Sequence, residues 1–124
     1  MAGLTLDAGA LIAYERGEQR IREILAVAYA RGLVPTIPAI ALAEVWRGDA
    51  QDARIARLLK ACSIEVVDER LARAAGRLRR ATSGADTVDA CIAVGVSKRG
   101  DVIATSDAGD MRRLLGPGST ILAV

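Results

Sequence analysis

The chain has 124 residues and a mass of 13.0 kDa, and we expect residues 1–124 to form a single domain. Hydrophobic residues make up 52% and charged residues 26%, a composition that excludes an intrinsically disordered chain. The longest uncharged stretch, from Gly32 to Ala43, is too short to span a membrane and contains two prolines. We therefore predict no membrane association, and the N-terminus shows no signal-peptide pattern.

The sequence contains no histidine. This excludes a Ser-His-Asp triad, a Cys-His pair, histidine-based zinc sites and RNA cleavage by paired histidines. Cys62 and Cys91 lie in apolar surroundings without CxxC spacing, which is typical of reduced thiols in the core of a cytoplasmic protein. An enzyme with this composition works with carboxylates, hydroxyls, arginine, lysine or a bound metal that prefers oxygen.

The net charge is +2, from 17 basic and 15 acidic residues, and 15 of the basic residues are arginine. A near-neutral total can hide segregated charge. If about five acids converged in one site, the ten others would face 17 bases across the remaining surface. Such a protein would hold a cation and attract phosphate groups at the same time. The alternative is an ordinary mixed surface.

Short apolar runs alternate with amphipathic stretches. In chain order, the pattern predicts a strand at Leu4–Leu6, helices at Ala8–Tyr14 and Glu18–Ala30, a strand at Leu33–Ile37, helices at Ala39–Trp46 and Asp49–Ala61, a strand at Ile64–Val67, helices at Asp68–Ala81 and Asp86–Lys98, a strand at Val102–Thr105, a helix at Ala108–Leu115 and a strand at Thr120–Val124. This alternation predicts an α/β fold in which helices cover both faces of a mostly parallel sheet. Such sheets bind ligands beyond the carboxyl ends of their strands.

Four carboxylates stand out against this architecture. Asp7 directly follows the first predicted strand and Asp107 the fourth, so both lie at the carboxyl edge of the sheet. Glu44 and Asp89 lie in unusually apolar helices, where a carboxylate is costly unless it is paired or bound to a metal. Because a divalent cation removes the repulsion among converging carboxylates, the pattern predicts a site for Mg²⁺ or Mn²⁺.

Each acid also has a purely structural interpretation. Asp7 and Asp86 are suited to cap the helices that follow them, and Glu44 could pair with a buried arginine. Asp107 and Asp110 are three residues apart, so one of them could cap the last helix. The polar residues beside Asp107, which are Thr105 and Ser106, either hydrogen-bond a carboxylate, a water or a phosphate, or are ordinary strand-end residues.

The chemistry of the predicted site follows from its ligands. A cation held by Asp7, Asp89 and Asp107 would keep several of its waters. One of these waters, its pKa lowered by the metal, would attack a phosphodiester. Glu44 or Asp89 would orient this water or accept its proton, and arginines at the rim would hold the substrate phosphates.

Four fragments in this order resemble one known family. They are Leu6–Ala13, Ile37–Trp46, Ala85–Ala90 and Ile103–Asp107, the last followed by Asp110. Together they resemble PIN-domain ribonucleases, in particular the VapC-type toxins of bacterial toxin–antitoxin modules. The resemblance covers nearly the whole chain. It implies a single PIN domain with a three-layer α/β/α fold and a mostly parallel sheet of about five strands.

The resemblance also implies an activity and partners. It assigns Asp7, Glu44, Asp89 and Asp107 to an acidic metal site that cleaves RNA with Mg²⁺ or Mn²⁺. It implies a homodimer and inhibition by a small VapB-type antitoxin. Gly9 departs from the pattern, because many relatives carry Ser or Thr two residues after the first aspartate.

An antitoxin segment would lie in a groove, and Trp46 could line it together with Tyr14, Ile40 and Leu11. The alternative places Trp46, the only tryptophan, in the core.

Other functions fit the residues less well. A receiver domain needs paired acids after the first strand and a lysine near the fifth, and a haloacid-type phosphatase needs Asp-x-Asp where this chain has Asp7-Ala8-Gly9. A dinucleotide-binding fold needs a glycine-rich turn that is absent. The remaining alternative is a PIN-like module that binds RNA or protein without cleaving it.

Overall fold

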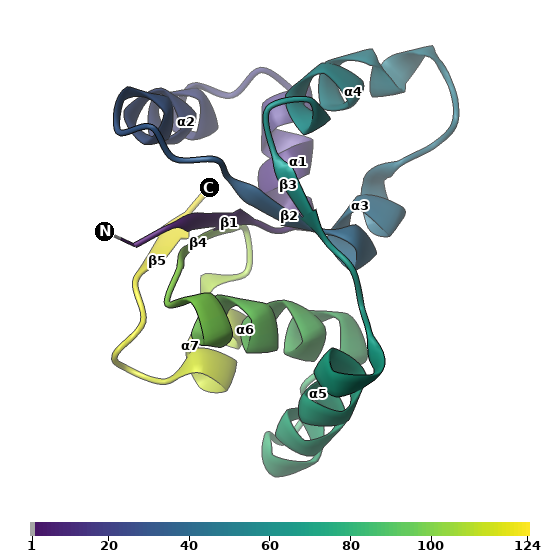
Figure 1. Ribbon diagram of the computed structural model, residues 1–124, viewed down its shortest axis with the longest axis vertical. Helices are drawn as coiled ribbons and strands as arrows, with labels where there is room; N and C mark the ends of the chain where they lie inside the picture. Colours follow the sequence, from purple (N-terminus) through teal and green to yellow (C-terminus); the bar gives the residue numbers. More distant parts are fainter. Residues whose placement is uncertain (1) are drawn as a thin grey trace.

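A parallel sheet of five strands forms the centre of the computed structural model, which describes residues 2–124 (Figure 1). The strands are β1 (Leu4–Leu6), β2 (Thr36–Pro38), β3 (Ser63–Glu65), β4 (Val102–Thr105) and β5 (Ile121–Ala123). Their order across the sheet is β3-β2-β1-β4-β5, and every neighbouring pair is parallel. The prediction of a mostly parallel sheet of about five strands is confirmed.

Helices cover both faces of this sheet. They are α1 (Ala8–Glu15), α2 (Gln19–Ala30), α3 (Ala39–Val45), α4 (Ala53–Leu59), α5 (Glu69–Ala81), α6 (Thr87–Arg99) and α7 (Ala108–Leu115). In Figure 1, α1, α2 and α4 lie on one side of the sheet, and α5, α6 and α7 lie on the other. The three-layer α/β/α arrangement is therefore as expected. Within the described chain, no helix is long and apolar enough to cross a membrane.

The two faces of the sheet bury separate clusters of apolar side chains. On the first face, Leu6 and Ala104 pack with Leu11 and Ile21. On the second face, Ile103 packs with residues of α6 and α7. Both faces are covered because the central strands β1 and β4 are buried and mainly apolar, which is typical of parallel sheets. Because both faces of the sheet are covered, we expect a binding site at the carboxyl ends of its strands.

Most predicted elements agree with the observed ones to within one residue at each end, and three differ by more. Strand β2 begins at Thr36 rather than Leu33, and its last residue, Pro38, is also the N-cap of α3. The predicted helix Asp49–Ala61 is a 3₁₀ turn at Ala50–Asp52 followed by α4, because the Asp52 carboxylate accepts backbone N–H groups of the preceding loop. Strand β3 ends at Glu65, because this edge strand loses its only pairing partner where β2 ends at Pro38.

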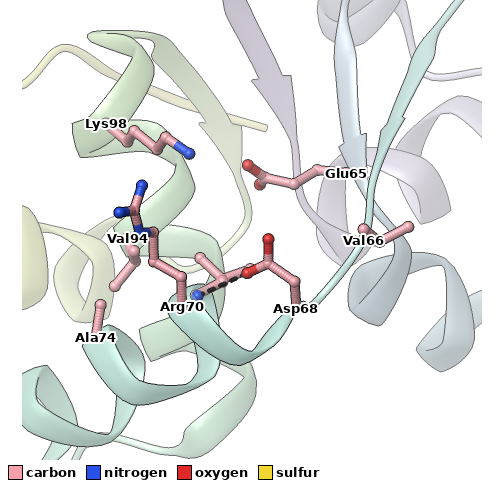
Figure 2. A pocket seen from close by; sticks show the side chains of 8 residues that line it. Glu65, Val66, Asp68, Arg70, Ala74, Val94 and Lys98 are labelled. Atoms are coloured by element: carbon pink, nitrogen blue, oxygen red, sulfur yellow. Dashed lines mark hydrogen bonds between the residues drawn. The ribbon is translucent and has the colours of Figure 1, made fainter.

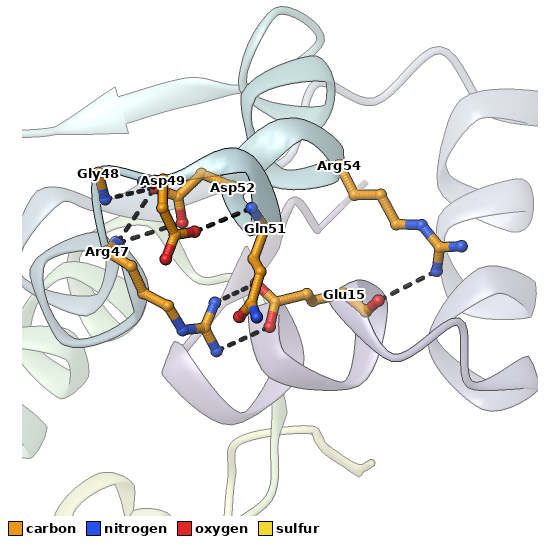
Figure 3. Close-up of polar contacts among 7 residues, drawn as sticks. All are labelled: Glu15, Arg47, Gly48, Asp49, Gln51, Asp52 and Arg54. Carbon is orange, nitrogen blue, oxygen red and sulfur yellow. Dashed lines mark hydrogen bonds and ion pairs between the residues drawn. The ribbon is translucent and has the colours of Figure 1, made fainter.

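Polar contacts hold the loop after α3 against α1 (Figure 3). The Arg47 guanidinium donates two hydrogen bonds to the Glu15 carboxylate, at 2.8 and 2.9 Å. Arg54 donates to the Glu15 carbonyl oxygen at 3.0 Å. The Asp52 carboxylate accepts from the backbone N–H of Arg47, Gly48 and Asp49, and these hydrogen bonds lower the pKa of its carboxyl against the effect of burial. These contacts fix α3, which carries Glu44, relative to α1.

The C-terminal end of α6 is anchored to the sheet by Arg99. Its guanidinium donates to Asp101 Oδ2 at 2.9 Å and to Thr5 Oγ1 at 3.0 Å, and it forms an ion pair with Glu65. Thr5 in turn donates to Asp101 at 2.8 Å. The middle of α6 is buried, and the Arg99 contacts at its C-terminal end help to fix where its N-terminal turn lies at the carboxyl edge.

Candidate metal-binding active site

Asp7 is the first residue after β1 and lies at the carboxyl edge of the sheet. It is the N-cap of α1, and its Oδ1 accepts the Ala10 backbone N–H at 2.9 Å. The residue is only 6% exposed. Burial raises the pKa of its carboxyl, whereas hydrogen bonds from the Thr105 side chain and from the N–H groups of Ala10 and Gly9 oppose this rise. The capping interpretation of Asp7 is therefore correct, and it is compatible with a place in the site.

Asp89 reaches the same edge from the opposite face of the sheet, in the first turn of α6. It is half-buried. Burial raises the pKa of its carboxyl to about 6, and repulsion from Asp86, Asp107, Asp110 and Asp7 adds to this effect. A carboxyl with this combination of burial and like-charged neighbours marks a candidate functional site.

Asp107 and Asp110 complete a tight cluster with Asp89. Carboxylate oxygens of these three residues lie within 4.8 Å of one another. Asp107 precedes α7 without capping it, and Asp110 lies in the first turn of that helix. The cluster therefore includes Asp110, which the sequence indicated only as an extra acid. Its three-residue distance from Asp107 was the available signal, because residues i and i+3 share one helix face.

Glu44 and Asp86 do not belong to this three-residue cluster, although Asp86 is close enough to Asp89 and to Glu44 to raise the pKa of both. Asp86 is the N-cap of α6 and accepts the Asp89 backbone N–H at 2.8 Å, so its capping interpretation is correct. Glu44 is exposed on α3, and desolvation followed by repulsion from Asp86 and Asp7 raises the pKa of its carboxyl. Within residues 2–124 it forms no ion pair with an arginine, so that alternative is wrong.

Gly9 and Ser106 bring the first turn of α1 against the turn after β4. A Cβ atom added at Gly9 would lie 2.0 Å from Ser106 Oγ and 2.9 Å from the Ser106 backbone nitrogen, so only glycine fits there. The Ser106 hydroxyl fills the space that a side chain at position 9 would occupy. The departure of Gly9 from the family pattern is therefore matched by the hydroxyl of Ser106, the residue after β4, and the close contact brings Asp7 towards Asp107.

A small pocket beside the cluster contains a basic side chain. Its lining residues are Thr82, Gly84, Ala85, Asp86, Asp89, Asp110, Arg113 and Leu114. Arg113 Nη1 lies 3.4 Å from Asp110 Oδ1 in an exposed pair. A cation and a phosphate could thus be held side by side here.

The donor set fits a hard divalent cation. All of the acidic groups present oxygen atoms, which Mg²⁺ and Mn²⁺ prefer, and no histidine or cysteine belongs to the cluster. Burial, followed by repulsion from the neighbouring aspartates, raises the pKa of Asp89, and a bound cation would favour the ionised carboxylate against both effects.

The interpretation of Trp46 as a core residue is wrong, because 45% of it is exposed. Leu11 is fully buried and cannot line a groove beside it. Tyr14 is half-buried, so part of its side chain is exposed and could line such a groove.

This parallel α/β fold with an acidic cluster at the carboxyl edge of its sheet is the arrangement of a known family of domains. Residues 4–114 match the PIN domain, so the chain belongs to the PIN domain family. A comparison with curated proteins finds no match.

Several solved structures share the fold over nearly the whole chain. VapBC from Salmonella typhimurium bound to DNA is 21% identical with a TM-score of 0.73, covering 99% of this chain and 98% of that one. VapBC2 from Rickettsia felis bound to a promoter DNA fragment is 14% identical with a TM-score of 0.79, covering 98% of each chain. A toxin–antitoxin complex from Klebsiella pneumoniae is 17% identical with a TM-score of 0.75, covering 98% and 97%. At these identities the likeness establishes the fold.

Proposed function

We propose that residues 1–124 form a single PIN domain that acts as a Mg²⁺- or Mn²⁺-dependent endoribonuclease, the toxin of a type II toxin–antitoxin module. The observation that carries this proposal is the convergence of carboxylate oxygens from Asp89, Asp107 and Asp110 within 4.8 Å, with buried Asp7 beside them. The similar structures, which are VapBC complexes and another toxin–antitoxin complex, support the same assignment.

In this proposal Asp7, Asp89 and Asp107 hold the cation, and Asp110 adds a carboxylate. When bound, the cation activates water and neutralises negative charge at the scissile phosphate. Glu44 accepts the proton of the attacking water, a role that suits an exposed carboxyl whose pKa is raised. The Thr105 side chain orients Asp7 by a hydrogen bond.

The remaining polar groups position these residues or the substrate. Asp86 holds the first turn of α6 through the Asp89 backbone N–H. Ser106 is exposed beside the acidic cluster and offers its hydroxyl to a substrate phosphate. Arg113 lies next to Asp110 and offers its guanidinium to the same phosphate.

The proposal extends to partners and location. We propose that the chain forms a homodimer in the cytoplasm and is neutralised by a cognate VapB-type antitoxin. Exposed Trp46, which follows Glu44 by two residues near the site, is the side chain that we expect the antitoxin to cover.

The test incubates the purified protein with total cellular RNA in Mn²⁺, Mg²⁺ or EDTA. We expect discrete fragments that require the metal and disappear in Asp7→Asn and Asp89→Asn. Glu18→Gln is the matched control, because Glu18 is exposed and makes no capping hydrogen bond. Cleavage that survives Asp7→Asn would reject the site. The absence of both cleavage and Mn²⁺ binding would favour a PIN-like module without catalysis.

A further inference from the structure

Helix α5 has a small inner face and an arginine-rich outer face. It packs on α6, and of its 13 residues only Ala75 is buried. Arg70, Arg73, Arg77 and Arg80 recur every three or four residues. At 3.6 residues per turn they fall within an arc of about 80° and extend for about 15 Å along the helix. We call these four residues the arginine stripe.

The stripe is exposed and has almost no partners. All four arginines are exposed, and within residues 2–124 the only ion pair among them joins Arg73 to Glu69. The side chains of that pair are 72% and 78% exposed, so it contributes little to stability. A row of like charges repels itself in the free protein, and an anionic partner removes this repulsion. Ion pairs within the described residues therefore do not account for this row of like charges.

The N-terminal end of the stripe gains a further positive charge from α6. Arg70 and Lys98 line the same depression of about 400 Å³ between the two helices (Figure 2). Of the two acids in this depression, Glu65 pairs with Arg99 through Oε2 while its Oε1 has no hydrogen-bond partner in the described residues, and Asp68 accepts the Leu71 backbone N–H at 2.8 Å.

The C-terminal end of the stripe leads to the acidic cluster. Helix α5 ends at Ala81, and Thr82 and Gly84 of the following loop line the pocket that contains Asp89. Arg113 crosses from α7 to this loop, because its Nη2 lies 3.5 Å from the position of a Cβ at Gly84. Arg113 therefore lies beside the loop that follows the stripe, at the edge of the acidic cluster.

We propose that the arginine stripe binds the phosphate backbone of RNA and leads the strand past Arg113 to the acidic cluster. The path to the cluster rests on the function proposed above. Arginine suits this role because its planar guanidinium donates two parallel hydrogen bonds to a phosphate. Backbone contacts also suit a chain that has one tryptophan, two tyrosines and no phenylalanine for base stacking. A symmetric contact with a second copy through this face would instead bring like charges together.

The test measures the binding of a fluorescein-labelled single-stranded oligouridylate by anisotropy, in EDTA and over a series of salt concentrations. One variant changes all four stripe residues to glutamine. The matched control changes the same number of exposed arginines in the layer across the sheet, which are Arg16, Arg22, Arg31 and Arg57. Both variants therefore have the same net charge, and thermal melts compare their stability.

We expect the stripe variant to bind at least tenfold more weakly at low salt than the control. Because each contact with a single strand contributes about 0.7 to the slope of log affinity against log salt, four lost contacts lower that slope by about 2.8. Equal losses in the two variants would overturn the proposal, as would unchanged binding by the stripe variant. A change of oligomeric state only in the stripe variant, with RNA binding intact, would assign the stripe to a protein contact and overturn it too.

The test separates this proposal from the function on which it rests. Wild-type protein that binds RNA through the stripe but cleaves none in Mn²⁺ would support the stripe and refute the nuclease. Mn²⁺ binding measured in both variants checks that the acidic cluster is intact, since none of the eight substituted residues belongs to it.

Discussion

Asp89→Asn is expected to stabilise the metal-free protein at neutral pH while removing a metal ligand. Asp89 is half-buried at the N-terminus of α6 and faces the other acids of the cluster, so its pKa rises from 3.8 to about 6. The folded protein therefore binds more protons than the unfolded chain between about pH 4 and 6. The free energy of unfolding consequently falls as pH rises through this window and stays low above it.

The magnitude follows from this pKa shift. A shift of about two units corresponds to about 3 kcal/mol, because each unit is worth about 1.4 kcal/mol. Asp89 is partly exposed, and solvent screening reduces this figure to about 1–2 kcal/mol. Asp89→Asn should therefore raise the free energy of unfolding at pH 7.5 in EDTA by about 1–2 kcal/mol and change it little at pH 4. The melting temperature at pH 7.5 should rise by roughly 4–8 °C.

The assay is urea unfolding followed by circular dichroism at pH 4, 5, 6 and 7.5, on wild type, Asp89→Asn and the control Glu18→Gln. A second series adds Mn²⁺, which should stabilise the wild type and leave Asp89→Asn nearly unchanged. The reasoning is refuted if Asp89→Asn destabilises the protein at pH 7.5, or if its effect is the same at every pH. A similar gain in Glu18→Gln would show that net charge, and not the cluster, is responsible.

Three further predictions concern the framework around the site. Arg99→Met should lower the free energy of unfolding in urea titrations by about 3 kcal/mol, because the Asp101 side chain, which is 5% exposed, loses its ion-pair partner. A loss below about 1 kcal/mol would contradict this prediction. Gly9→Ala should lower the free energy of unfolding, measured by urea titration, by about 1–3 kcal/mol. Adding Ser106→Gly should restore only part of this loss, since the backbone nitrogen at position 106 still lies 2.9 Å from the new Cβ. Full recovery would show that the side-chain clash alone matters. Cys62, whose pKa burial raises to about 11, should react with iodoacetamide at pH 8 at least tenfold more slowly in the folded protein than in urea, as measured by mass spectrometry; equal rates would show an accessible thiolate.

Local sequence patterns predicted most of the secondary structure because hydrophobic periodicity marks each helix and strand. The bounds were wrong where one side chain or a missing partner strand overrides the pattern. Asp52 is the clearest case, since its carboxylate organises the loop before α4 and divides one predicted helix into two. Strand β3 ends early because β2 beside it ends at Pro38, although the apolar run continues to Val67.

The sequence also located Asp7 and Asp107 at the carboxyl edge of the sheet. Asp7 and Asp107 directly follow β1 and β4, and strand ends in a parallel sheet share an edge whatever the details of packing. The absence of histidine excludes histidine-based catalysis and histidine-based zinc sites. Both inferences need only the order and the composition of the residues along the chain, so the sequence by itself was sufficient for them.

Tertiary structure alone decided which groups meet. The sequence could not show that Asp110 joins Asp89 and Asp107, or that Ser106 fills the space above Gly9, because each contact joins elements that pack from different parts of the chain. The position of α5 is a further example, since its arginine spacing is visible in the sequence but the placement of the loop after it beside Asp89 is not. Distances between residues remote in sequence depend on how α1, α6 and α7 pack on the sheet, and local patterns carry no information about that packing.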